Sequence, residues 1–162
     1  MYTLFMKRSV KKGLGFGLTS GVITTLGLLI GLNASTHSKA VVISGVLVIA
    51  VADSLSDALG IHASEETENS RSHNEIWMST LSTFVSKGVF SLSFITPILF
   101  LPLSQAIIVC TIWGIALIII LNYYLAKNRK TNPLTALIEH VFIAIIVIIL
   151  SHLIGSYVRS IF

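Results

Sequence analysis

The chain has 162 residues, of which 54% are hydrophobic and only 11% are charged, and its mean hydropathy is +0.88. A soluble domain carries about 25% charged residues, so this composition excludes an ordinary soluble domain and predicts an integral membrane protein. The net charge of +4 belongs to short basic clusters beside apolar segments, which is typical of topology signals and not of a nucleic-acid-binding surface.

Five segments are long and apolar enough to cross roughly 30 Å of hydrocarbon as helices. They lie at 13–33, 40–62, 77–101, 104–126 and 134–158. The expected fold class is therefore an all-α integral membrane protein with five transmembrane helices. Residues 1–12 form a basic N-terminal segment, and 13–162 form one membrane domain with a short acidic loop at 64–76. Pro102 suits the boundary between the third and fourth helices, and we expect Pro97 to kink the third.

The charges of the short loops predict the orientation. Basic residues precede the first span and separate the fourth from the fifth: Lys7, Arg8, Lys11, Lys12, Lys127, Arg129 and Lys130. The opposite side carries Lys39 and Arg159. The positive-inside bias therefore places the N-terminus in the cytoplasm and the C-terminus outside, in the cell membrane of a prokaryote or otherwise in an organelle membrane.

Glycines recur every four residues along the first span, at Gly13, Gly17 and Gly21 and again at Gly27 and Gly31. Small residues at this interval let membrane helices approach closely. The first helix is therefore expected at the centre of the bundle or at a subunit interface.

Two carboxylates, Asp53 and Asp57, interrupt the apolar second span. A charge in hydrocarbon costs several kcal/mol, so such residues face a partner, a water-filled cavity or an ion. One interpretation is a cation or proton site, to which Ser20 on the first helix adds an oxygen. The other is an ion pair with Lys87, which lies at the same depth as Asp53, on the order of 14 Å from the cytoplasmic ends. Lys87 then either competes with a transported cation or occupies its place permanently.

The acidic loop is a second candidate site. His62, Glu65, Glu66 and Glu68 are expected to gather cations at the cytoplasmic mouth, because mixed histidine and carboxylate sets suit borderline divalent metals. A solvated acidic loop without metal is the alternative. The single cysteine, Cys110, excludes a disulfide within the chain and is expected to be a buried apolar residue.

Residues 17–31, 54–64 and 132–155, with the turn bounded by Pro97 and Pro102, together resemble the vacuolar iron transporter family. The resemblance implies a homodimer formed through the first helix, with an ion pathway lined by helices one and two. It also implies efflux of Fe²⁺ or Mn²⁺ from the cytosol in exchange for protons, with the divalent cation as substrate and no permanent cofactor. Where the family has an acidic residue on helix one, this chain has Ser20, and the family's methionine on helix two falls on Asp57.

The expected function is therefore divalent cation transport, with Asp53, Asp57 and Ser20 at the site and His62, Glu65, Glu66 and Glu68 loading it. The alternative is a non-transporting membrane scaffold that keeps the fold and an internal Asp–Lys ion pair. The expected partners are the lipid bilayer and a second copy of the chain, without nucleic acid. Phosphate-binding loops, His-Glu-x-x-His motifs and nucleophile elbows are absent from the sequence, so we do not expect an enzyme.

Overall fold

The computed structural model describes residues 2–68, 71–129 and 133–162, which are helical apart from short connections. Helix α1 (Tyr2–Thr36) is the first rod. The second rod is continuous and consists of α2 (Lys39–Val48), a short π-helix η1 (Ile49–Asp53) and α3 (Ser54–Glu66). Helices α4 (His73–Ser93) and α5 (Ile95–Phe100) form a third rod, and α6 (Leu103–Arg129) and α7 (Pro133–Ile161) complete the fold.

The described part of the chain contains five helical segments long and apolar enough to span a membrane. They are Arg8–Thr36, Lys39–Glu66, His73–Phe100, Leu103–Tyr124 and Leu137–Ile161. Each covers one of the five predicted spans, so the expected number of helices and their order are confirmed. Both ends of the acidic loop are helical, because α3 continues to Glu66 and α4 begins at His73, where Ser72 and Glu75 form a capping box.

Pro97 explains why the third rod is divided at Phe94. Proline has no N–H, and its ring clashes with the carbonyl group four residues earlier, here that of Ser93. At the division the Phe94 N–H bonds the Ser91 carbonyl, three residues earlier, at 3.2 Å, whereas a regular α-helix would use the carbonyl four residues earlier. At the far end of α5, Lys39 Nζ donates to the carbonyl oxygens of Leu99 and Leu101 at 2.9 and 3.2 Å. This cation satisfies carbonyl groups that the helix end leaves without partners.

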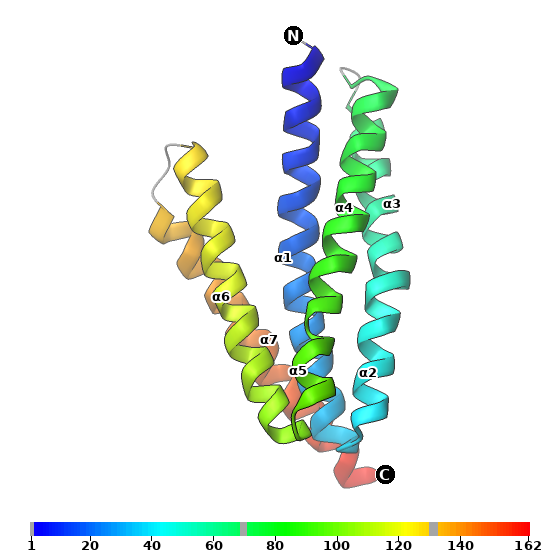
Figure 1. Ribbon diagram of the computed structural model, residues 1–162, viewed down its shortest axis with the longest axis vertical. Helices are drawn as coiled ribbons and strands as arrows, with labels where there is room; N and C mark the ends of the chain where they lie inside the picture. The colour runs from blue at the N-terminus through cyan, green and yellow to red at the C-terminus, as the bar shows by residue number, and fades with distance from the viewer. Residues whose placement is uncertain (1, 69–70, 130–132) are drawn as a thin grey trace.

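Helix α1 lies at the centre of the bundle, between the rod pair α3–α4 and the pair α6–α7 (Figure 1). Gly13, Gly17 and Gly21 face α4: a Cβ at Gly17 would overlap the Ser86 hydroxyl and the Thr83 carbonyl oxygen. Its last two glycines face α7, where a Cβ at Gly27 would meet Val147. The expectation of a central first helix is confirmed within one chain.

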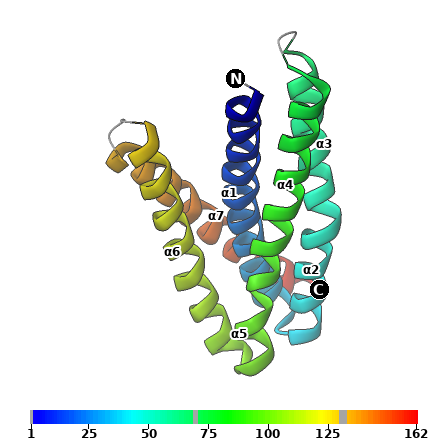
Figure 2. The same ribbon diagram turned by 45° about the horizontal axis from the view of Figure 1, so that its top comes forward.

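The apolar core occupies the half of the bundle farther from the N-terminus. Val22, Leu26 and Leu29 of α1 pack there against α2, α5, α6 and α7. Cys110 belongs to this cluster, is fully buried and is a free thiol, as expected. Toward the N-terminus, α6 and α7 lean away from α1 (Figure 2).

The outer surface of the bundle is apolar. Only 11% of the fifth span is buried inside the chain, and large hydrophobic residues such as Phe142, Ile149 and Ile154 are exposed. Apolar surface of this extent needs lipid or a protein partner to cover it. The two termini lie at opposite ends of the bundle (Figure 1), as expected for five helical segments that run back and forth along it.

Candidate functional site

The site is built around the π-helical turn η1 in the middle of the second rod. The Ser54 N–H bonds the Ile49 carbonyl five residues earlier, and the Ser54 hydroxyl donates to the same oxygen at 3.2 Å. A π turn accommodates one more residue than an α turn and is frequent at functional sites. Sequence reasoning missed it, and no residue in 49–53 marks it.

The π turn moves the two carboxylates from the buried stripe of the rod to its border. Val42 and Val46 are buried, and a 3.6-residue period would carry the buried face on to Asp53 and Asp57. After the extra residue, Ser54 and Ala58 are buried instead. Both carboxylates therefore lie beside the packed face, in reach of α1 and α4 and still partly open.

Four residues come together at this border from α1, from the rod of η1 and α3, and from α4; we call them the Asp–Lys cluster: Asp53, Asp57, Ser20 and Lys87. Lys87 Nζ of α4 lies 2.6 Å from Asp53 Oδ2 and 2.6 Å from Asp57 Oδ2. It also donates to Ser20 Oγ of α1 at 3.1 Å, and the Ser20 hydroxyl donates to Asp57 Oδ2 at 2.6 Å. One ammonium group thus holds both acids and the serine.

Close packing of backbone at two glycines, Gly21 and Gly88, buries the Lys87 side chain. A Cβ at Gly21 would lie 3.2 Å from Lys87 Cα and Cγ, and a Cβ at Gly88 would lie 3.1 Å from the Ala50 carbonyl oxygen. The Lys87 side chain is 0% exposed, whereas those of Asp53 and Asp57 are 38% and 22% exposed. The cation is therefore enclosed, and the carboxylates form the accessible side of the cluster.

The predicted Asp53–Lys87 ion pair is confirmed. Sequence reasoning placed Ser20 near the carboxylates but did not anticipate that one lysine contacts both of them. The depth of each charge along its helix indicated which charges could meet. The rotation of each helix decides that Asp57 also contacts Lys87, and this rotation is set by the glycine contacts and the π turn.

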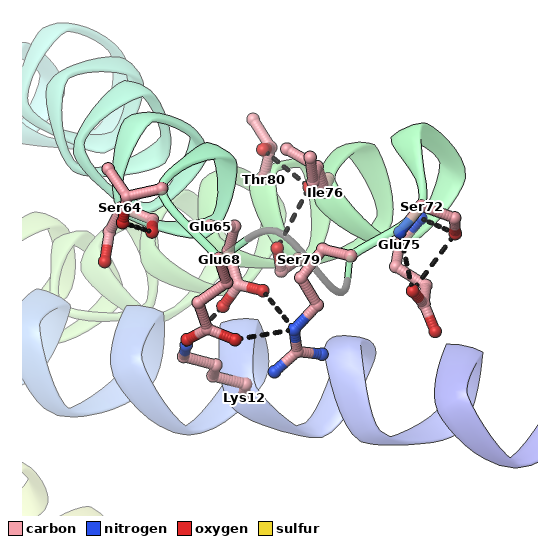
Figure 3. Close-up of polar contacts among 11 residues, drawn as sticks. Lys12, Ser64, Glu65, Glu68, Ser72, Glu75, Ile76, Ser79 and Thr80 are labelled. Atoms are coloured by element: carbon pink, nitrogen blue, oxygen red, sulfur yellow. Dashed lines mark hydrogen bonds and ion pairs between the residues drawn. The ribbon is translucent and has the colours of Figure 1, made fainter.

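A second group of charges joins the end of α3 to α1 and includes two of the residues proposed to load metal (Figure 3). Glu65 is fully buried and forms ion pairs with Lys12 and with Arg71, whose Nε lies 3.2 Å from Glu65 Oε2. Glu68 accepts a hydrogen bond from Arg71 at 2.9 Å and lies 3.8 Å from Lys12 Nζ. Sequence reasoning missed both cations as partners, although the i,i+3 spacing of Glu68 and Arg71 is a signal for such a pair.

Arg71 also sets the protonation of this loop. Its hydrogen bond to Glu68, and then its positive charge and that of Lys12, lower the pKa of the Glu68 carboxyl group. The same hydrogen bond raises the pKa of Arg71. Both groups are therefore held in their charged forms, as a stable ion pair requires.

His62 and Glu66 form a separate contact on the outer side of α3. His62 Nε2 lies 3.4 Å from Glu66 Oε1, while His62 Nδ1 lies 2.9 Å from the Thr80 hydroxyl. The imidazole ring also meets Trp77 edge-to-face at 4.8 Å between centroids. Within residues 2–68, 71–129 and 133–162, no three His, Cys, Asp or Glu side chains gather as a metal would need. Metal loading by His62, Glu65, Glu66 and Glu68 stays a prediction.

Comparison of the chain with protein-family models, curated proteins and solved structures finds no match. The resemblance to vacuolar iron transporters, and the dimer, pathway and substrate that it implies, therefore stay predictions.

Proposed function

We propose that this protein spans a membrane five times and carries a divalent cation across it, with the Asp–Lys cluster as the binding site. The five apolar helices and the exposed apolar surface support insertion. The basic residues of the N-terminal segment and of the connection between α6 and α7 favour a cytoplasmic N-terminus.

The observation that carries the proposal is the unequal charge of the cluster. Two aspartates face one lysine, so the formal charge is −1. A structural ion pair needs only one carboxylate, and an uncompensated charge at this depth costs several kcal/mol. The second aspartate is therefore explained best by a proton or cation that joins the cluster.

The chemistry of the ligands supports a hard divalent cation. Asp53, Asp57 and Ser20 offer oxygen atoms, which suit Mn²⁺, Mg²⁺ and similar ions better than soft metals. Because Lys87 Nζ already contacts Oδ2 of both carboxylates, an entering cation has to displace it. We propose Mn²⁺ or Fe²⁺ as cargo, moved out of the cytosol in exchange for protons.

The loop charges fit a loading step at the cytoplasmic mouth. His62 and exposed Glu66 are proposed as the first contacts of the cation. Glu65 and Glu68 would take part after exchanging Lys12 and Arg71 for the metal, so these ion pairs would hold the mouth closed in the metal-free protein.

Flux in proteoliposomes tests the proposal. External Mn²⁺ or Fe²⁺ should enter vesicles containing the parent protein, as a metal-sensitive dye inside reports, with movement of protons in the opposite direction. Asp57→Asn should reduce the flux to that of empty vesicles. Glu139→Gln removes one carboxylate from an exposed position of α7, so this control should keep the flux. A parent protein that moves none of the divalent cations tested contradicts the proposal.

A non-transporting scaffold is the second candidate, favoured by the complete burial of Lys87 against both carboxylates. In this case the lysine replaces the ion permanently. Lys87→Met separates the two candidates, since it would tighten Mn²⁺ binding in a transporter and only destabilise a scaffold.

A further inference from the structure

A groove of about 700 Å³ lies between α1, α4 and α6 at the end of the bundle that carries the N-terminus. It forms because α6 and α7 pack against the second half of α1. Gly114 of α6 meets Leu26, and Gly27 meets Val147 of α7. Toward the N-terminus, α6 inclines away from α1 in both views (Figures 1 and 2), so the first half of α1 borders the groove.

The mouth of the groove is cationic. Its lining includes Arg8, Lys11, Lys12 and Arg71, and none of the described residues that line it is acidic. Lys12 and Arg71 are shared with Glu65 and Glu68, and Glu75 also attracts Arg71. Four cations against these three carboxylates still leave positive charge in excess. Arg8 and Lys11 are exposed at the mouth of the groove.

Below the mouth the groove is apolar. Leu14, Leu18, Phe90 and Leu121 form this part of the lining. Leu18 lies seven residues beyond Lys11, which is roughly 10 Å along the helix. Tyr124, which is 60% exposed, stands on α6 beside the mouth. Charge at one end and hydrocarbon at the other fit a molecule with an anionic head and an apolar chain.

We propose that this groove binds an anionic phospholipid of the cytoplasmic leaflet. The phosphate would contact Arg8 and Lys11, and one acyl chain would lie along Leu14, Leu18 and Phe90. Basic pockets between membrane helices on the cytoplasmic side suit such headgroups. A bound lipid fills the space between α6 and α1 and so stabilises the bundle. The inference depends on the proposed insertion and orientation, but not on cation transport.

Stability in lipid nanodiscs tests the proposal. Tm is measured in phosphatidylcholine alone and in phosphatidylcholine with one quarter phosphatidylglycerol. The double variant Arg8→Gln/Lys11→Gln is compared with Lys39→Gln/Arg159→Gln, which removes the same charge at the other end. Native mass spectrometry of the parent protein, released from an equimolar lipid mixture, measures which lipid remains bound and needs no variant.

Phosphatidylglycerol should raise the Tm of the parent and of the control, and one molecule should be retained in preference to phosphatidylcholine. In Arg8→Gln/Lys11→Gln the apparent affinity for phosphatidylglycerol should fall about 25-fold, because each basic residue near an anionic headgroup raises the affinity about fivefold.

An equal loss of affinity in both double variants would show diffuse surface attraction and overturn the site. Equal retention of the two lipids would also overturn it. So would stabilisation by inorganic phosphate or glycerophosphoglycerol alone, which would show a phosphate site without an acyl chain.

Discussion

Lys87 shows how a charged side chain is accommodated inside an apolar bundle. Its aliphatic stem packs against Gly21, and its ammonium group reaches three oxygen-bearing side chains. Removing an unpaired charge from water would cost far more than the fold gains. The partners of Lys87 are therefore as necessary to the structure as the apolar residues around it.

The stability of the cluster depends on its charge balance. Lys87→Met leaves two carboxylates without a counter-charge and should lower the free energy of unfolding by about 3 kcal/mol. Adding Asp57→Asn should restore part of the loss, and adding Asp53→Asn as well should restore most of it. Denaturant unfolding in detergent measures the four proteins. Equal stability of Lys87→Met and the parent would argue against a buried, coupled cluster.

Glu68 gives a prediction for pH. Its pKa in the folded protein is below the ordinary value of 4.5, because of the hydrogen bond from Arg71 and the nearby positive charges of Arg71 and Lys12. A carboxyl group of this kind contributes stability that is complete above its unfolded pKa and is lost as pH falls through the folded pKa. The Tm difference between the parent and Glu68→Gln should therefore be largest at neutral pH and shrink in acid. A difference that does not change with pH would exclude this ion pair as its cause.

At the scale of the element, α1 uses its two glycine series for two different neighbours. The first series meets α4, where Ser82, Thr83 and Ser86 are also small, and the second meets α7 near Ser151. Small residues on both sides allow backbones to approach closely, which is the main source of packing energy between membrane helices. A partner copy of the chain would have to contact α1 at other residues.

Gly17 and Gly60 provide a matched test of this packing. In Gly17→Ala the new methyl group overlaps the Ser86 hydroxyl and the Thr83 carbonyl oxygen, so we expect a loss of about 1–3 kcal/mol. In Gly60→Ala nothing lies within 4 Å of the methyl group, and the better helix propensity of alanine should leave stability unchanged or raise it by up to about 1 kcal/mol. Thermal unfolding of both variants measures the effect, and similar losses would contradict the close approach of α1 and α4.

The whole molecule has its termini at opposite ends (Figure 1), and the basic residues predict which end is cytoplasmic. Single cysteines test this in a Cys110→Ala background, in which the buried native thiol is absent. An impermeant maleimide should label Ser160→Cys in intact cells, and Lys11→Cys only after permeabilisation. Both positions are exposed. Labelling of both cysteines from one side would contradict five crossings.

The sequence alone predicted the five apolar helices long enough to span a membrane and the disturbance at Pro97, and it offered the Asp53–Lys87 pair as one of two interpretations. These features depend on local composition and on distance along helices, and both can be read from the amino-acid sequence. The contact of Lys87 with Asp57, the π turn at Ile49–Asp53 and the capture of Glu65 by Lys12 and Arg71 required the tertiary structure. The physical reason is that these contacts depend on how each helix is rotated and tilted against its neighbours. Rotation follows from the simultaneous packing of glycines, serines and core residues that are far apart in the sequence.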